Sequence, residues 1–289
     1  MHPNVVILAG GVSSRMKKES NALSLDPLLL QDAQEKSKAM IGVGDNKRPF
    51  LDYLLYNIEQ AGYRNVVIVV GERDDSIRKY YETGDGAKLF PSLDISYAVQ
   101  KIPTRRQKPL GTADALLEAL KAMTAWKRQK LTVCNSDNLY SVNALQLLLE
   151  DRHDNAMIDY DRSALKFGQE RITQFAVIKK DADGFLEDVI EKPSAEEITS
   201  ASDRSGRIGV SMNFFRLSYD TIYPFLEKVP LHPHRQEKEL PIAVKMMINR
   251  YPRSMFTIPL SEHVPDLTNP ADILEVKAYL EREFPKWKQ

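Results

Sequence analysis

The sequence predicts an α/β protein in which a mostly parallel sheet lies between two layers of helices. Two observations support this prediction. In the first half of the chain, short apolar segments that end at glycine or polar residues alternate with segments of helical periodicity. This alternation is typical of parallel strands joined by crossover helices. The strand segments at residues 5–9 and 66–70 are also apolar at consecutive positions, as expected for strands that helices cover on both faces.

The first half is expected to follow the order βαβαβαβ. Strands are predicted at residues 5–9, 66–70, 95–99 and 131–134, and helices at 49–61, 75–81 and 112–122. In the first helix the apolar residues Leu51, Leu54 and Ile58 fall on one face, and Gly62 marks its end. Thr112 can cap the third helix.

The second half is less regular and is expected to extend the same sheet. Strands are predicted at residues 173–179, 185–190, 208–217 and 255–260, and helices at 238–249 and 271–283. No Pro-, Gly- or Ser-rich linker separates the halves, so residues 1–289 are expected to form a single domain. Residues 17–36 lack clear periodicity and are interpreted as a mobile insertion after the first loop.

The composition excludes several classes of protein. The 289 residues carry 40 Lys and Arg against 40 Asp and Glu, a formal net charge of zero, whereas nucleic-acid and anionic-membrane binders are usually basic. Cys134 is the single cysteine, so no internal disulfide can form. The apolar run at residues 5–9 is too short for a signal peptide or a membrane span. We expect a cytoplasmic protein with no nucleic-acid or membrane partner, and homo-oligomerisation stays open.

Paired glycines follow the first predicted strand. Gly10 and Gly11 precede Arg15 by a few residues. Glycines let backbone N–H groups approach a phosphate closely, and a nearby arginine supplies a planar cation with several donors. The spacing matches neither of the common glycine-rich nucleotide motifs, GxGxxG and GxxxxGK[ST]. A tight glycine turn with a surface arginine explains this segment equally well.

A carboxylate follows the last strand predicted in the first half. Asp137 lies just beyond residues 131–134, at the end of a predicted central strand. Ligands of open α/β sheets bind at the carboxyl ends of strands, and a carboxylate there can hold Mg²⁺ against substrate phosphates. Alternatively, Asp137 caps a turn or the helix that begins near Val142.

The order of several motifs resembles that of the sugar-phosphate nucleotidylyltransferases. The motifs are Leu8 to Met16, Lys38 in Ser37-Lys38-Ala39-Met40, residues 109–115, Asn135-Ser136-Asp137, Glu191-Lys192-Pro193 and Asp266-Leu267-Thr268-Asn269-Pro270. The resemblance implies a Rossmann-like, three-layer fold of the nucleotide-diphospho-sugar transferase (GT-A-like) type. It implies a nucleotide-binding half at about residues 1–140 and a sugar-binding half at about 141–289, in the short form without a trailing β-helix domain.

This resemblance implies an enzyme that converts a nucleoside triphosphate and a sugar 1-phosphate to a nucleotide sugar and pyrophosphate. The reaction needs positioning and charge neutralisation rather than a covalent nucleophile. By resemblance, Arg15 and Lys38 are catalytic, and Asp137 and Asp266 bind Mg²⁺. The implied nucleotide-binding residues are Leu8, Ala9, Gly10, Gly11, Gln100, Gly111 and Thr112.

Sugar-side roles fall, by the same resemblance, to Glu191, Lys192 and Asn213. A carboxylate can accept hydrogen bonds from sugar hydroxyls, and Lys192 can reach the sugar phosphate if the chain bends at Pro193. Without the other motifs, Glu191-Lys192-Pro193 would be interpreted as an ordinary charged turn. Asn213 stands where many relatives have glycine, and its amide either binds a sugar hydroxyl or shapes the turn.

Some positions depart from the family pattern and leave alternatives open. Residues 13–16 also resemble the molybdopterin guanylyltransferase and cytidylyltransferase branches, so a non-sugar acceptor stays an alternative and the base is undetermined. Ala39 replaces a common proline after Lys38, and Lys47 is a rival for the motif lysine. A non-catalytic nucleotide-sugar sensor is a third reading, against which the joint presence of Arg15, Asp137 and Asp266 argues.

Three further segments with basic, acidic or histidine side chains are not assigned to the predicted site. The basic residues at 101–108 are expected to form a solvated loop, which near a nucleotide pocket would also attract phosphate. Glu237 and Glu239 are assigned a structural role. His232 and His234 are placed on an exposed loop without a zinc site.

Overall fold

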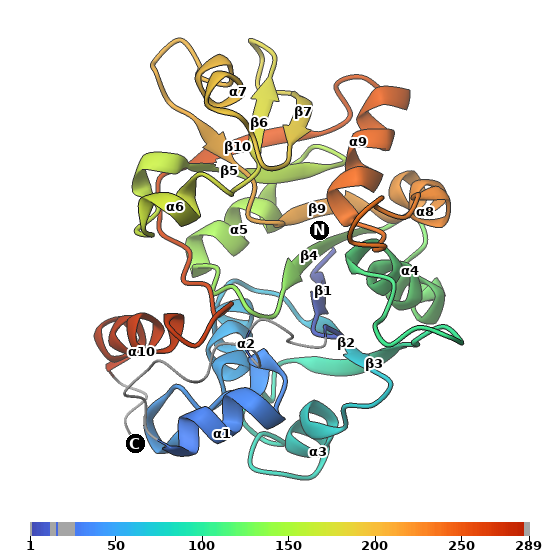
Figure 1. The fold of residues 1–289 in the computed structure, drawn as a ribbon. Helices are drawn as coiled ribbons and strands as arrows, with labels where there is room; N and C mark the ends of the chain where they lie inside the picture. Colours follow the sequence, from blue (N-terminus) through green and yellow to red (C-terminus); the bar gives the residue numbers. More distant parts are fainter. Residues whose placement is uncertain (1, 12–15, 17–26, 286–289) are drawn as a thin grey trace.

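A ten-stranded sheet forms the centre of the computed structural model, which describes residues 2–11, 16 and 27–285 (Figure 1). The strands are β1 (Asn4–Leu8), β2 (Asn65–Gly71), β3 (Asp94–Gln100), β4 (Lys130–Asn135), β5 (Ala156–Asp161), β6 (Val177–Lys180), β7 (Leu186–Ile190), β8 (Gly209–Val210), β9 (Phe215–Ser218) and β10 (Phe256–Leu260). They follow the order β3-β2-β1-β4-β9-β5-β8-β6-β7, and β10 pairs with β5. The strands β1 to β4 are parallel, whereas β9 pairs antiparallel with both β4 and β5.

Helices cover both faces of this sheet. They are α1 (Pro27–Glu35), α2 (Phe50–Gln60), α3 (Ser76–Glu82), α4 (Thr112–Ala122), α5 (Val142–Glu150), α6 (Gln169–Ile172), α7 (Ala195–Ser200), α8 (Tyr219–Lys228), α9 (Leu240–Arg250) and α10 (Asp272–Glu283). Figure 1 shows α4, α8 and α9 gathered on one side of β1 and β4. None of these helices of the described residues is long and apolar enough to cross a membrane.

The alternation of side chains along β1 builds a core on each face. Val5 and Ile7 lie in one apolar cluster, together with residues of α2, α5 and α10. Val6 and Leu8 lie in a second cluster, with residues of α4, α8 and α9. Successive side chains of a strand point to opposite faces, so a strand that is apolar throughout needs helices on both sides. The predicted α/β fold with three layers is therefore confirmed.

The predicted elements of the first half match the structure closely, while two predicted strands of the second half do not. Residues 208–217 were predicted as one strand, but they form β8, a turn and the start of β9. Asn213 lies in that turn at a φ of 53°, a left-handed conformation that no strand contains. The predicted strand at 173–179 is also wrong at its start, because α6 ends just before it and β6 begins only at Val177.

Other elements escaped prediction. Residues 27–35 belong to α1, so the interpretation of 17–36 as one mobile insertion is wrong for this part, and residues 17–26 lie outside the described ones. The helix α8 contains Pro224, a residue that normally breaks a helical pattern. The strand β5 has the short sequence AMIDYD, in which two aspartates interrupt the apolar run.

The strand order creates a crevice beside β1. This strand lies between β2 and β4, and the chain moves from β1 to β2 and β3 on one side before it crosses to β4 on the other. In open α/β sheets, ligands bind at such a reversal of strand order, next to the carboxyl ends of the strands. The segments that follow β1 and β4 are those with the predicted phosphate and metal residues.

Candidate functional site

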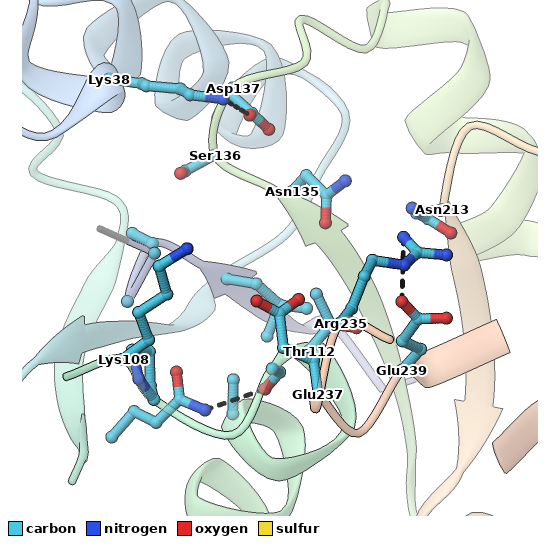
Figure 2. Close-up of a pocket in the computed structure, with 18 of the residues that line it drawn as sticks. Lys38, Lys108, Thr112, Asn135, Ser136, Asp137, Asn213, Arg235, Glu237 and Glu239 are labelled. Atoms are coloured by element: carbon cyan, nitrogen blue, oxygen red, sulfur yellow. Dashed lines mark hydrogen bonds and ion pairs between the residues drawn. The ribbon is translucent and has the colours of Figure 1, made fainter. Parts of the chain in front are cut away.

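A cavity of about 370 Å³ opens at the carboxyl ends of β1, β3 and β4 (Figure 2). Of the residues predicted for the site, those that line it are Leu8, Ala9, Gly10, Gly11, Lys38, Gln100, Gly111, Thr112, Asp137, Glu191 and Asn213. Lys192 and Asp266 do not line it, and Arg15 lies outside the described residues. Segments from both halves of the chain thus share one cavity wall.

The glycine loop leaves its backbone open to the cavity. A Cβ atom at Gly10 would lie 2.8 Å from Oε1 of Gln100, whereas a Cβ at Gly11 would meet nothing within 4 Å. Gly10 is therefore needed for close contact with Gln100 on β3, and Gly11 borders open space. Backbone N–H groups in such a bend are suited to bind phosphate oxygens.

Gln100 and Gly111 form a rigid wall beside this loop. Nε2 of Gln100 donates hydrogen bonds to the carbonyl of Gly111 at 2.8 Å and to Oδ2 of Asp114 at 2.9 Å. Gly111 has a φ of +107°, and a Cβ there would lie 2.7 Å from the carbonyl oxygen of Lys238. Both the conformation and the space favour glycine at this position.

Lys38 and Asp137 meet at another side of the cavity. The side chain of Lys38, from the 3₁₀ helix η2 (Lys38–Met40), places Nζ 2.9 Å from Oδ2 of Asp137. Figure 2 shows this pair at the top of the cavity. The rival Lys47 lies in η3 (Asp45–Lys47), is exposed and does not line the cavity. Of the two candidate lysines, the structure brings Lys38 to the site.

The chain segment that contains Asp266 pairs with the segment that contains Asp137. The backbone N–H of Leu267 donates to the carbonyl of Asp137 at 2.8 Å, and Asn138 forms an isolated antiparallel bridge with Asp266. Burial raises the pKa of the Asp266 carboxyl to about 6, and the negative charge of Asp137 adds to this shift. The two carboxylates therefore lie close enough to repel each other.

The donor set near Asp137 fits a magnesium ion that also binds phosphates. Mg²⁺ commonly uses one or two carboxylates plus substrate phosphates and water, and Asp137 and Asp266 provide two. Their mutual repulsion is a cost that a bound cation would remove. Among the described residues, no cluster of three or more His, Cys, Asp or Glu residues forms a metal site with protein ligands alone.

Glu191 and Asn213 line the sugar side of the predicted site. Glu191 is an exposed residue of the cavity wall, where partial desolvation raises the pKa of its carboxyl and the negative charge of Glu239 raises it further. Lys192 is exposed, adopts a φ of 48° and does not line the cavity. The left-handed backbone of Asn213 explains why a residue that tolerates this conformation stands there.

Four charged residues of the cavity wall were not among the predicted site residues. These are Lys108, Arg235, Glu237 and Glu239. Nη1 of Arg235 lies 2.9 Å from Oε1 of Glu239, and Figure 2 shows the pair beside Asn213. For Glu237 and Glu239 the purely structural interpretation is incomplete, since both face the cavity. For Lys108 the signal was the basic run at 101–108, which was expected to attract phosphate if it lay near a nucleotide pocket.

Backbone hydrogen bonds bring the segment of Arg235 to the site. The N–H of Lys238 donates to the carbonyl of Leu110, and the N–H of Ala113 donates to the carbonyl of Lys238 at 3.0 Å. Oγ1 of Thr112 accepts a further hydrogen bond from the N–H of Leu240 at 2.9 Å. The loop before α4 and the loop before α9 therefore form one wall.

A family model identifies the group of proteins to which the chain belongs. The model of the nucleotidyl transferase family matches residues 4–225, which is more than half of the sequence. The chain belongs to the nucleotidyl transferase family. The matched span of this nucleotidyl transferase includes the glycine loop, the Lys38–Asp137 pair and Glu191. The resemblance between its motifs and those of sugar-phosphate nucleotidylyltransferases is confirmed at the level of the family.

Curated relatives of this nucleotidyl transferase include sugar-phosphate enzymes. It is 26% identical over 190 residues to glucose-1-phosphate adenylyltransferase 1 of Vibrio vulnificus (strain YJ016), an alignment that covers 66% of this chain and 43% of that protein. It is 25% identical over 213 residues to glucose-1-phosphate adenylyltransferase of Anaeromyxobacter sp. (strain Fw109-5), which covers 72% and 47%. The chain thus spans less than half the length of these relatives.

Solved structures share the fold of this nucleotidyl transferase. A UDP-glucose pyrophosphorylase complexed with UDP-glucose superposes with a TM-score of 0.70 at 17% identity, covering 98% of this chain and 100% of that one. A UDP-glucose pyrophosphorylase from Acinetobacter baumanii gives a TM-score of 0.68 at 15% identity, covering 100% and 96%. At these identities the likeness concerns the fold.

Proposed function

We propose that the protein is a Mg²⁺-dependent nucleotidylyltransferase that joins a nucleoside triphosphate to a sugar 1-phosphate and releases pyrophosphate. One observation above all supports this proposal: the glycine loop, the Lys38–Asp137 pair, Gln100 and Glu191 line the same cavity. The phosphates, base and sugar of the two substrates, together with the metal ion, would thus all find binding residues in one cavity. The glucose-1-phosphate adenylyltransferases among the relatives favour a sugar 1-phosphate as the acceptor.

The chain's own residues would do the work of positioning. An oxygen of the sugar phosphate attacks the α-phosphorus, a new P–O bond forms, and the bond to the β-phosphate oxygen breaks with loss of pyrophosphate. The amides of Gly10 and Gly11 would hold the triphosphate, and Lys38 would neutralise its charge from the position it occupies beside Asp137. Arg15 would stabilise the departing pyrophosphate. Asp137 and Asp266 would hold Mg²⁺, which when bound supplies further charge neutralisation at the phosphates.

The base and the sugar would lie on opposite walls. Gln100, Gly111 and Thr112 would face the base, on a wall held rigid by the two hydrogen bonds from Nε2 of Gln100. Glu191 and Asn213 would bind sugar hydroxyls. Arg235 lies in the cavity wall on this side, so it would meet the sugar phosphate more readily than Lys192, whose side chain would have to turn inward.

Pyrophosphate release tests the proposed reaction. The four common nucleoside triphosphates are combined with a set of sugar 1-phosphates in the presence of Mg²⁺. Release with a specific pair is expected, and Arg15→Ala should lower it about 10²-fold because charge on the leaving group is no longer neutralised. Arg128→Ala, on the loop before β4 and away from the cavity, is the control. Triphosphate binding without release for any sugar phosphate would contradict the proposal and favour a non-sugar acceptor or a sensor.

Sugar 1-phosphate binding should depend on pH through Glu191. Its pKa is raised, so the carboxyl becomes protonated as pH falls, above the pH range in which an ordinary glutamate does. Protonation removes a charged hydrogen-bond acceptor. We therefore expect KM for the sugar 1-phosphate to rise through this range, and Glu191→Gln to have a KM about tenfold higher without this pH dependence.

Glu187→Gln is the matched control for this measurement. Glu187 lies on β7, the strand that ends just before Glu191, and its side chain is exposed. Glu187→Gln should retain the KM and the pH profile of the unmodified protein. That profile contains the titration of the substrate phosphate in addition to that of Glu191. Equal profiles for Glu191→Gln and Glu187→Gln would show that Glu191 does not bind the sugar.

A further inference from the structure

Arg171 on α6 contacts the proposed metal carboxylate from outside the cavity. Its Nη2 lies 2.7 Å from Oδ2 of Asp266, and its Nη1 donates a hydrogen bond to Oδ1 of Asp272. The guanidinium carbon also lies 4.5 Å from the centroid of the Phe167 ring. Arg171 does not line the cavity, so any effect on substrates must pass through Asp266.

Both carboxylate oxygens of Asp266 are oriented by neighbours. While Oδ2 faces Arg171, Oδ1 accepts a hydrogen bond from Oγ1 of Thr268 at 2.5 Å. The bridge between Asn138 and Asp266 holds the backbone beside Asp137. Backbone pairing therefore sets where Asp266 lies, and Arg171 and Thr268 set how its carboxylate is turned.

Arg171 is itself held by groups other than Asp266. Oδ2 of Asp272 accepts hydrogen bonds from the N–H groups of Thr268 at 2.8 Å and Asn269 at 2.7 Å, which fixes the carboxylate that Arg171 binds. Phe167 fixes one face of the guanidinium. The cation would therefore remain in place when a metal ion binds, because its other contacts persist.

We propose that Arg171 is a positioning residue that holds the Asp266 carboxylate in a fixed orientation beside Asp137 for divalent-cation binding. The inference rests on the proposed function, in which Asp266 is a metal ligand. Groups that hydrogen-bond or pair with metal-binding carboxylates commonly change metal affinity about 10- to 100-fold when removed. If Arg171 only tied α6 to the segment before α10, its removal would lower the stability of the protein but would not act through Asp266.

Mn²⁺ binding separates these two roles. The free Mn²⁺ signal in electron paramagnetic resonance is measured during titration of the whole protein with Mn²⁺ alone, for the unmodified chain, Arg171→Gln, Asp266→Asn and the double variant. We expect Arg171→Gln to weaken Mn²⁺ binding about tenfold or more. In the Asp266→Asn background, Arg171→Gln should add nothing further, because residues that act through one contact are not additive. Higher Mg²⁺ should restore turnover of Arg171→Gln.

Two further variants complete the experiment. Arg253→Gln removes a guanidinium whose Nη2 lies 2.8 Å from Oδ2 of Asp183, remote from the cavity, and should leave Mn²⁺ affinity unchanged. Arg171→Lys keeps the charge but cannot bind Asp266 and Asp272 at once, so it should give an intermediate affinity even if Arg171→Gln does not fold.

The outcomes distinguish failure of the inference from failure of the proposed function. If Asp266→Asn weakens Mn²⁺ binding but Arg171→Gln and Arg171→Lys do not, the positioning role of Arg171 is overturned and the metal site is retained. Additive losses in the double variant would also overturn it in favour of a structural role. Unchanged Mn²⁺ binding in Asp266→Asn, or none in the unmodified protein, would remove the metal assignment and the inference with it.

Discussion

Asp137→Asn is expected to lower the rate of pyrophosphate release about 10³-fold. Asp137 is the proposed metal carboxylate that reaches the cavity, and its side chain is 25% exposed. Asparagine has nearly the same size but no charge, so the fold should be kept while the affinity for Mg²⁺ and the hold on Lys38 are lost. The measurement is initial velocity as a function of Mg²⁺ concentration, together with the thermal midpoint.

Asp154→Asn is the matched control. Asp154 also faces a lysine, with Oδ1 3.7 Å from Nζ of Lys130, but its side chain is 86% exposed on the surface. Such surface pairs contribute little, so this variant should retain full activity. If Asp137→Asn keeps turnover within a few-fold and the same Mg²⁺ dependence, the metal has been assigned to the wrong carboxylate.

Lys38→Ala is expected to lower kcat/KM for the nucleoside triphosphate about 10²-fold. The side chain is 13% exposed, and its Nζ is held at 2.9 Å from Asp137, so a positive charge is already oriented in the proposed phosphate site. Alanine removes that charge and also leaves Asp137 without this ion pair. Steady-state kinetics with the triphosphate varied and the sugar 1-phosphate saturating measure the loss.

Lys47→Ala provides the comparison within the same segment of the chain. Lys47 is exposed on η3 and lies outside the cavity, so its removal should leave kcat/KM unchanged. A large loss for Lys47→Ala with normal activity for Lys38→Ala would identify Lys47 as the motif lysine. That result would require the segment before α2 to rearrange when substrate binds.

Local patterns predicted β1, β2 and β4 well because each of these strands is mainly apolar and buried. Strands with helices on both faces need apolar side chains at consecutive positions, and the segments 5–9, 66–70 and 131–134 meet this condition by themselves. The helices at 49–61 and 112–122 have clear apolar faces and end near glycine or polar residues. Prediction was weaker after residue 140, where Pro224 lies within α8 and Asn213 interrupts a segment that looks continuous.

The sequence by itself determined the chemical groups of the candidate site and the strands that precede them. Gly10, Gly11 and Asp137 follow apolar strands, and parallel strands necessarily end at one edge of a sheet. Local pattern was sufficient there because a strand and the loop after it are continuous in the chain.

Only the tertiary structure decided which distant segments complete the site. Asp266 lies beside Asp137 through backbone hydrogen bonds to residues 137–139, and the loop of Arg235 is joined to that of Gly111 through Lys238. It likewise placed Lys38 rather than Lys47 in the cavity and left Lys192 outside. Such pairings depend on how the loops pack against one another once the sheet has formed. Local periodicity in the sequence does not indicate hydrogen bonds between loops that are far apart along the chain.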